Sequence, residues 1–102
     1  MLYLVVSTPR AERPSDMTAR RKDYWRWLAP LQSSGRCKWA CARVGRGAAA
    51  LFDVAGNEAL HRLLNEWADI IPATFDVYPL IDSASAKRFL AGASKRSAQR
   101  KR

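Results

Sequence analysis

The sequence predicts a single α+β domain whose elements follow the order strand, helix, strand, strand, helix, strand. The length of 102 residues suits one hydrophobic core and leaves no room for a second. A hydrophobic content of 48% excludes a chain that is disordered throughout. Segments with a two-residue or β-branched apolar pattern alternate with segments of helical periodicity, and this alternation predicts the element order.

The first strand and the first helix are expected before residue 36. Residues 2–7 are rich in β-branched and aromatic side chains, and Pro9 ends the strand that they predict. A helix is expected from about Met17 to a stop at residues 33–35. The stripe at helical spacing consists of Met17, Arg21, Tyr24, Leu28 and Leu31.

The remaining elements follow from alternation, turn residues and a second apolar stripe. Residues 36–44 predict a strand, and residues 48–54 its hairpin partner across a turn at 45–47. Asn57 caps the second helix, and residues 74–81 form the last strand. A short helix is expected to end at Leu90. One face of the second strand is expected to carry Cys37, Trp39, Cys41 and Arg43.

This order is the ferredoxin-like βαββαβ pattern, with a four-stranded antiparallel sheet and both helices on one face. The other face of the sheet then has no cover from its own chain. An exposed apolar face of this size marks an interface or a ligand cleft. We therefore expect a homodimer or larger homo-oligomer in which two sheets pack face to face as a dimeric α/β barrel that encloses a cavity.

The net charge of +9 is concentrated at the end of the chain, because the last eight residues carry five basic groups and no acidic one. We expect a folded domain over residues 1–92 and a basic, disordered tail over 93–102. The tail solubilises the protein or tethers it to nucleic acid. Basic and aromatic residues also mix at 20–27, where an amphipathic helix explains them better than a nucleic-acid surface.

Several other classes are excluded by short patterns. No apolar run approaches the roughly 18 residues of a membrane span, and no signal peptide is evident. Cys37 and Cys41 lie about 13 Å apart in one strand, too far for a disulfide. Two cysteines and one histidine match no zinc pattern. We therefore expect a cytoplasmic protein without a metal or another cofactor.

Several segments resemble the muconolactone isomerase family over about residues 1–82. They are the start at Met1, the strand 51–54, the helix start 58–61, the final strand 75–80, and the spacing from Gly35 to Gly45. The resemblance implies a dimeric α/β barrel that assembles further, and a cofactor-free enzyme of aromatic compound catabolism that moves a proton on a small unsaturated lactone acid. The carboxylate on the first helix of that family falls at Tyr24, with Asp23 beside it.

Isomerisation of this kind needs a base, a donor to the enolate, and a cation for the substrate carboxylate. The catalytic candidates are Asp76 as base and Tyr78 as donor, with Asp23 and Tyr24 on the first helix. The substrate-binding candidates are Arg43, Trp39, Tyr3, Cys41 and His61. Packing roles stay open for each of these residues, including an ion pair between Arg43 and Asp76.

Three functions therefore compete. The first is a muconolactone isomerase-like enzyme acting on a small lactone or aromatic-derived acid. The second is a non-catalytic barrel that binds a small ligand, and the third is a nucleic-acid-binding module that uses the basic tail. Oxidation of a substrate, as in related monooxygenase-like barrels, also stays open, although no residue argues for it.

Overall fold

The computed structural model describes the backbone of residues 1–100 and the side chains of residues 1–93. The elements are β1 (Leu2–Pro9), the 3-10 helix η1 (Pro14–Met17), α1 (Thr18–Ser33), β2 (Cys37–Ala42), β3 (Ala48–Asp53), α2 (Asn57–Ile70), β4 (Ala73–Leu80) and α3 (Ser83–Arg100). The predicted ferredoxin-like order is confirmed. None of the described helices has the length and hydrophobicity to cross a membrane.

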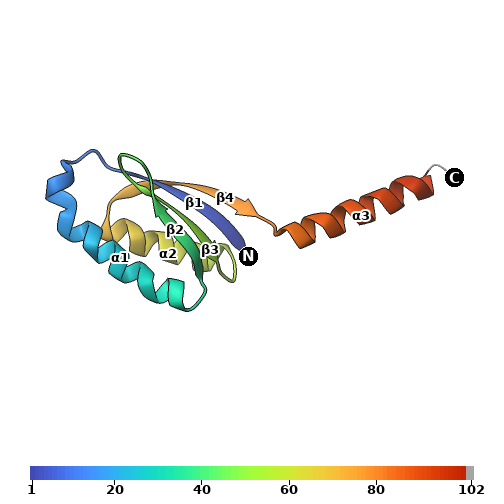
Figure 1. The fold of residues 1–102 in the computed structure, drawn as a ribbon, viewed down its shortest axis with the longest axis horizontal. Helices are drawn as coiled ribbons and strands as arrows, with labels where there is room; N and C mark the ends of the chain where they lie inside the picture. Colours follow the sequence, from blue (N-terminus) through green and yellow to red (C-terminus); the bar gives the residue numbers. More distant parts are fainter. Residues whose placement is uncertain (101–102) are drawn as a thin grey trace.

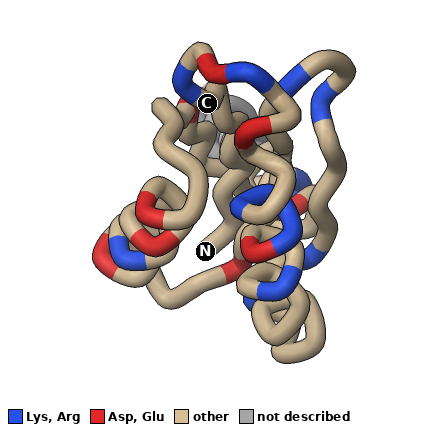
Figure 2. Tube along the Cα trace, turned by 90° about the vertical axis from the view of Figure 1, so that its left-hand side faces the viewer, with Lys and Arg blue, Asp and Glu red and all other residues tan. Residues whose placement is uncertain are grey.

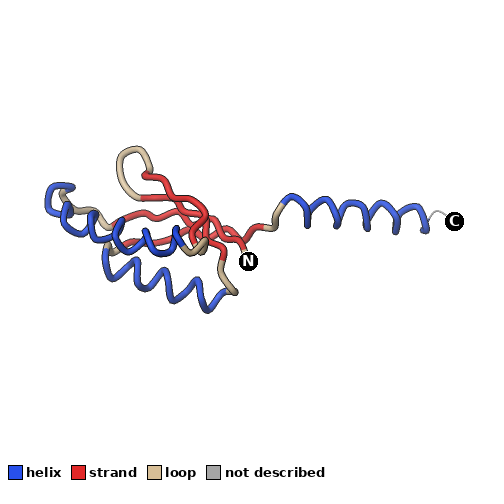
Figure 3. The backbone as a smooth tube through the Cα atoms, turned by 60° about the horizontal axis from the view of Figure 1, so that its bottom comes forward, coloured by secondary structure: helices blue, strands red, loops and turns tan. Residues whose placement is uncertain are grey.

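The four strands form one antiparallel sheet in the order β2-β3-β1-β4. Helices α1 and α2 lie side by side on one face of this sheet, and the opposite face is open (Figures 1 and 3). Strand alternation divides β1 between the two faces: Tyr3, Val5 and Ser7 are buried toward the helices, while Leu2 and Leu4 lie on the open face.

The core fills the space between the sheet and the two helices. Its largest fully buried side chains are Trp67, Tyr3, Phe52, Leu28, Val5 and Cys37. Trp67 of α2 is the centre of an aromatic cluster, with its ring centroid 4.8 Å from that of Tyr24 and 5.1 Å from that of Phe75. Aromatic side chains bury a large apolar area, so this cluster fixes α1 and α2 against β4.

A bulge in β2 places Cys37 on the helix-covered face of the sheet, although alternation predicted that it shares a face with Trp39 and Cys41. Cys37 pairs with Phe52 and Trp39 pairs with Leu51, so the register shifts between Cys37 and Trp39. An extra residue reverses the alternation of a strand. Cys37 is therefore buried under the helices, whereas Trp39 and Cys41 lie on the open face.

Helix α3 runs to Arg100 and so extends beyond the end expected at Leu90, and Gly92 lies inside it. It projects away from the sheet, and the chain measures 67 Å along its longest axis (Figure 1). The backbone N–H of Ser85 donates to Asp82 Oδ1 at 2.7 Å, and this bond lowers the pKa of Asp82. The boundary of the basic tail at residue 93 stays a prediction, and residues 101 and 102 lie outside the described part.

Candidate functional site

The open face brings together four of the predicted site residues. Strand pairing places Trp39, Leu51, Leu4 and Tyr78 in one row across the sheet, and Cys41, Ala49, Val6 and Asp76 in the next row. Trp39 is 43% exposed and Tyr78 is 50% exposed. Asp76 and Cys41 lie on opposite edge strands, which separates them by roughly 14 Å at the usual strand spacing. The face is therefore apolar at its centre, with polar groups spread along it.

Tyr3 does not belong to that face, and the expectation that it faces a barrel interior is wrong. Its side chain is 1% exposed and points toward the helices. Its hydroxyl donates a hydrogen bond of 2.6 Å to Asn57 Oδ1 at the start of α2. Alternation along β1 gives the reason, because Tyr3 shares its face with the buried Val5 and Ser7.

Two other candidates are engaged on the outer surface. Asp23 accepts a hydrogen bond of 3.0 Å from Arg26 Nη1 and is half-exposed. At 3.6 residues per turn, Asp23 points about 200° away from both Arg21 and Trp25 on α1. His61 is exposed, and its Nε2 lies 3.2 Å from Asn65 Nδ2. Neither residue approaches the open face or the cavity described next.

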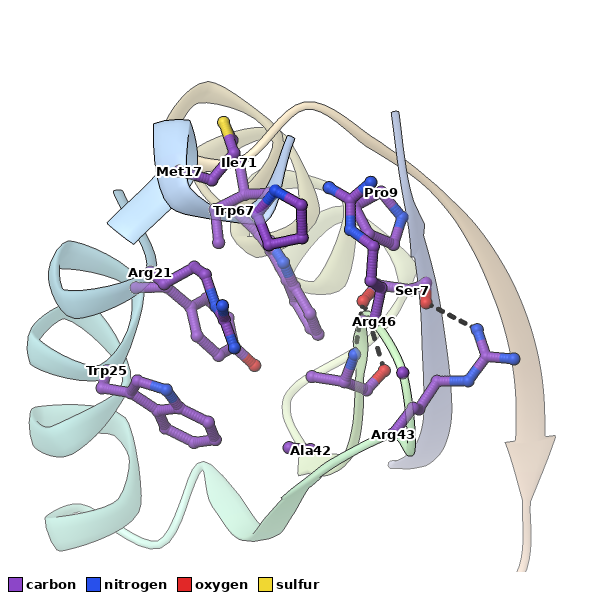
Figure 4. A pocket seen from close by; sticks show the side chains of 15 residues that line it. Ser7, Pro9, Met17, Arg21, Trp25, Ala42, Arg43, Arg46, Trp67 and Ile71 are labelled. Carbon is purple, nitrogen blue, oxygen red and sulfur yellow. Dashed lines mark hydrogen bonds between the residues drawn. The ribbon is translucent and has the colours of Figure 1, made fainter. Parts of the chain in front are cut away.

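A cavity of about 100 Å³ lies between the helix layer and the β2–β3 hairpin (Figure 4). Its walls come from β1, η1, α1, the hairpin and the end of α2. They consist of Ser7, Pro9, Pro14, Met17, Arg21, Tyr24, Trp25, Ala42, Arg43, Gly45, Arg46, Gly47, Ala48, Trp67 and Ile71. Segments that lie far apart in the sequence therefore meet at one site, and of the predicted residues only Tyr24 and Arg43 belong to it.

Tyr24 places a buried hydroxyl at this cavity. The residue is 3% exposed, and its hydroxyl has no hydrogen-bond partner among the described residues. Burial raises the pKa of Tyr24 well above its usual value, and the neighbouring Cys37 raises it further. The phenol is therefore neutral at physiological pH and can donate a hydrogen bond, but it cannot act as a base.

The guanidinium groups around the cavity differ in what they can bind. Arg43 Nη1 donates to the carbonyl oxygen of Ser7 at 2.9 Å and to Thr8 Oγ1 at 3.3 Å. Figure 4 shows this side chain passing to the far side of β1 from Trp67. Arg43 thus ties the hairpin to β1, and no ion pair with Asp76 forms among the described residues.

Arg21 and Arg46 are the cations that remain for a ligand. No acidic side chain belongs to the described walls of the cavity. Figure 2 looks at this end of the molecule, where Lys and Arg positions follow the loops and α1. Hydrogen bonds from Arg10 lower the pKa of Glu12 outside the cavity, and the charges of Arg10, Arg20 and Arg46 lower it further.

Only some of these residues could be recognised from the sequence. Arg21 occupies a position in the apolar stripe of α1, where a charged residue is unusual. Arg46 lies between two glycines, and this pattern predicted a turn but no ligand-binding role for the arginine. Ser7 is buried and accepts a hydrogen bond of 2.9 Å from the Ala48 N–H. Nothing in the sequence around Ser7 indicated that it lines a cavity. Among the described residues, no three potential metal ligands gather in one place.

Comparisons with known proteins agree with this architecture. No curated protein sequence matches the chain. Muconolactone isomerase superposes with a TM-score of 0.63 and 25% identity, covering 80% of this chain and 90% of that one. The 5-chloro-2-hydroxyhydroquinone dehydrochlorinase TftG of Burkholderia phenoliruptrix AC1100, solved with 2,5-dihydroxybenzoquinone, gives a TM-score of 0.67 at 13% identity over 83% and 98% of the two chains.

The family model described as "Domain of unknown function (DUF3303)" matches residues 1–94. This match spans the sheet and both helices that cover it, together with the start of α3. The resemblance to muconolactone isomerase that the sequence indicated is thus confirmed at the level of the fold family. The chain belongs to the DUF3303 family and has a muconolactone isomerase-like fold.

Proposed function

We propose that this chain is a small cofactor-free enzyme that binds a flat organic anion, a lactone acid or an aromatic-derived acid, and transfers a proton on it. The observation that carries the proposal is that the side-chain polar groups left free for a ligand in the described cavity wall can all donate hydrogen bonds. Arg21, Arg46 and the Tyr24 hydroxyl offer N–H and O–H groups between the indole walls of Trp25 and Trp67. Ligand sites commonly combine apolar walls with a few convergent polar groups of this kind.

The chemistry of such a lining is electrophilic. A guanidinium binds a carboxylate by charge-assisted hydrogen bonds. A neutral phenol stabilises the negative oxygen that forms when a proton leaves the carbon next to a carbonyl group. The effect at the buried Tyr24 is stronger than in water, because the effective dielectric constant is lower there, whereas Arg21 is exposed to solvent. Arg21, Arg46 and Tyr24 would therefore bind the substrate anion and stabilise its enolate.

Proton removal also needs a base, and the described walls contain no carboxylate and no imidazole. Asp23 points to the other side of α1, and Asp76 lies on the open face of the sheet. This composition favours a second candidate function, the binding of a small organic acid without catalysis. The two candidates share the same ligand and differ in whether the bound ligand exchanges a proton.

Self-association is part of the proposal. An apolar row crosses the open face of the sheet and consists of Trp39, Leu51, Leu4 and Tyr78. None of the described helices packs on this face (Figures 1 and 3). A second copy packed on this face would bury the row and bring Asp76 and Cys41 to the interface. The cavity opens on the helix side of the sheet, so it would stay accessible in such a homodimer.

The test is ligand binding by tryptophan fluorescence and calorimetry, with benzoate and an unsaturated lactone acid as probes. Arg21→Ala is compared with Arg62→Ala, which removes the same charge from an exposed position on α2 outside the cavity. We expect Arg21→Ala to weaken binding about tenfold or more, the effect of one charge-assisted hydrogen bond. Arg62→Ala should bind as the unmodified protein does.

Deuterium uptake from heavy water distinguishes the two candidate functions. Catalysed exchange at the carbon next to the carbonyl group of the lactone acid, followed by NMR, supports the enzyme. Binding without exchange supports the non-catalytic role. Failure of the unmodified protein to bind either probe overturns both.

A further inference from the structure

Tyr24 has a hydroxyl that none of the described residues hydrogen-bonds. The side chain is buried, with an exposed fraction of 3%, and its hydroxyl has no hydrogen-bond partner among the described residues. By contrast, the other deeply buried tyrosine, Tyr3, donates a bond of 2.6 Å to Asn57. Buried hydroxyls are nearly always hydrogen-bonded, because a lost bond to water costs free energy. An unpaired hydroxyl at the wall of a cavity therefore points to a ligand or solvent as its partner.

The polar groups around the hydroxyl limit the chemistry of that partner. The Ser7 hydroxyl is already used, since it accepts from the Ala48 N–H and donates to the Ala48 carbonyl. Arg43 is bound to Ser7 and Thr8. The groups left for a ligand are the cations of Arg21 and Arg46 and the phenol of Tyr24, and all of them are donors toward an anion.

The aromatic walls limit its shape. Tyr24 lies with its ring centroid 4.8 Å from Trp67 and 5.0 Å from Trp25, in tilted and edge-on contacts. Figure 4 shows Trp25 and Arg21 projecting from α1 into the space that faces Trp67. Aromatic walls of this kind favour a flat ring that stacks or packs edge-on. The cavity of about 100 Å³ suits a single ring.

We propose that Tyr24 selects an oxygen-bearing aromatic acid, by donating its phenolic hydrogen bond to a ring oxygen while an arginine binds the carboxylate. This inference rests on the proposed function and adds the class of ligand, a hydroxy- or oxo-substituted ring acid over the unsubstituted one. The raised pKa of Tyr24 agrees with it, because a neutral phenol keeps its proton for the bond. Tyr24 acts here as a specificity-determining residue that touches the ligand.

The experiment combines one substitution with matched ligands. Tyr24→Phe removes only the hydroxyl, and the probes are benzoate and the 2-, 3- and 4-hydroxybenzoates. Affinities are measured by calorimetry for all eight pairs. We expect Tyr24→Phe to weaken at least one hydroxybenzoate about fivefold to tenfold, the effect of one hydrogen bond, while benzoate affinity stays within about twofold. An equal loss for benzoate and all three hydroxybenzoates overturns the inference.

A second readout separates a ligand-binding hydroxyl from a structural one. Since the hydroxyl has no partner within the part of the chain whose side chains are described, Tyr24→Phe should unfold at the same temperature as the unmodified protein or a higher one. Tyr3→Phe is the matched control and should unfold at a lower temperature. A lowered midpoint for Tyr24→Phe would show a structural hydroxyl and overturn the inference. Failure of the unmodified protein to bind any of the acids would instead overturn the proposed function itself.

Discussion

Replacing Gly47 by alanine should damage the fold and the cavity together. Gly47 has a φ of +95°, which side chains rarely adopt. A Cβ at this position would lie 2.4 Å from the carbonyl oxygen of Ser7 and 3.2 Å from Pro9 Cδ. That carbonyl oxygen accepts the 2.9 Å bond from Arg43 Nη1, so the backbone cannot move aside without loosening the tie between the hairpin and β1.

Gly45 in the same turn provides the control. Its φ is +94°, but a Cβ there meets no atom within 4 Å. Gly45→Ala should therefore cost only the backbone strain, about 1–2 kcal/mol of unfolding free energy. Gly47→Ala adds the loss of a bond from a charged donor, about 1.5–3 kcal/mol, and should cost about 2.5–5 kcal/mol in total. A small domain has an unfolding free energy of about 5–15 kcal/mol, so Gly45→Ala should fold, and Gly47→Ala should lose a large part of its stability.

Urea unfolding followed by tryptophan fluorescence measures both costs. Gly45, Arg46 and Gly47 all line the cavity, but only a Cβ at Gly47 would displace the neighbouring backbone, so Gly47→Ala should weaken binding of benzoate more than Gly45→Ala does. If the two variants lose the same unfolding free energy within about 0.5 kcal/mol, the close approach of Gly47 to Ser7 does not constrain the fold and the reasoning fails.

Two further predictions concern residues of the sheet. Tyr3→Phe removes the 2.6 Å hydrogen bond to Asn57 and should lower the unfolding free energy by about 0.5–1.5 kcal/mol, with ligand affinity unchanged. A loss of ligand affinity in calorimetry would show that Tyr3 belongs to the binding site. Tyr78→Lys places a charge on the open face and should dissociate the proposed homodimer in sedimentation experiments, while thermal unfolding of the half-exposed position changes little. An unmodified protein that sediments as a monomer at all concentrations would contradict self-association through this face.

Periodicity predicted the elements because each signal is local. Alternation in residues 2–7 and the apolar stripe of α1 depend only on neighbours along the chain, and both agree with the structure. The bulge in β2 is different, since it depends on how Cys37 and Trp39 pair with β3. Strict alternation placed these two side chains on one face, and the structure places them on opposite faces. A bulge changes the face of every residue before it without changing the sequence pattern.

The cavity depended on contacts that a single sequence does not show. Arg46 in a glycine-rich turn and Ser7 in a strand lie about 40 positions apart, and the hairpin brings them to one wall. Arg21 was visible as a charged residue in an apolar stripe, although its role needed the position of Trp67 on α2. Arg43 was predicted to bind a carboxylate, but it reaches across Gly47 to β1 because that glycine leaves room for its side chain.

The presence of Tyr24 where the resembling family carries a carboxylate changes what this cavity can do. A carboxylate at that position would repel an anionic ligand and could accept a proton, whereas a buried phenol attracts the anion and keeps its own proton. Arg21 and Arg46 add positive charge, so the cavity stabilises a negative oxygen but does not create one. Its ligands should therefore be organic acids with a second oxygen that can accept the Tyr24 hydrogen bond, such as a hydroxylated ring acid. Binding beside Arg21 and Arg46 would lower the pKa of such a ligand, but removal of a carbon-bound proton still needs a base, and the described walls contain none. The described lining therefore accounts for the binding of a hydroxylated ring acid, the class that the Tyr24 hydroxyl would select, and proton transfer on it requires a base from outside these walls.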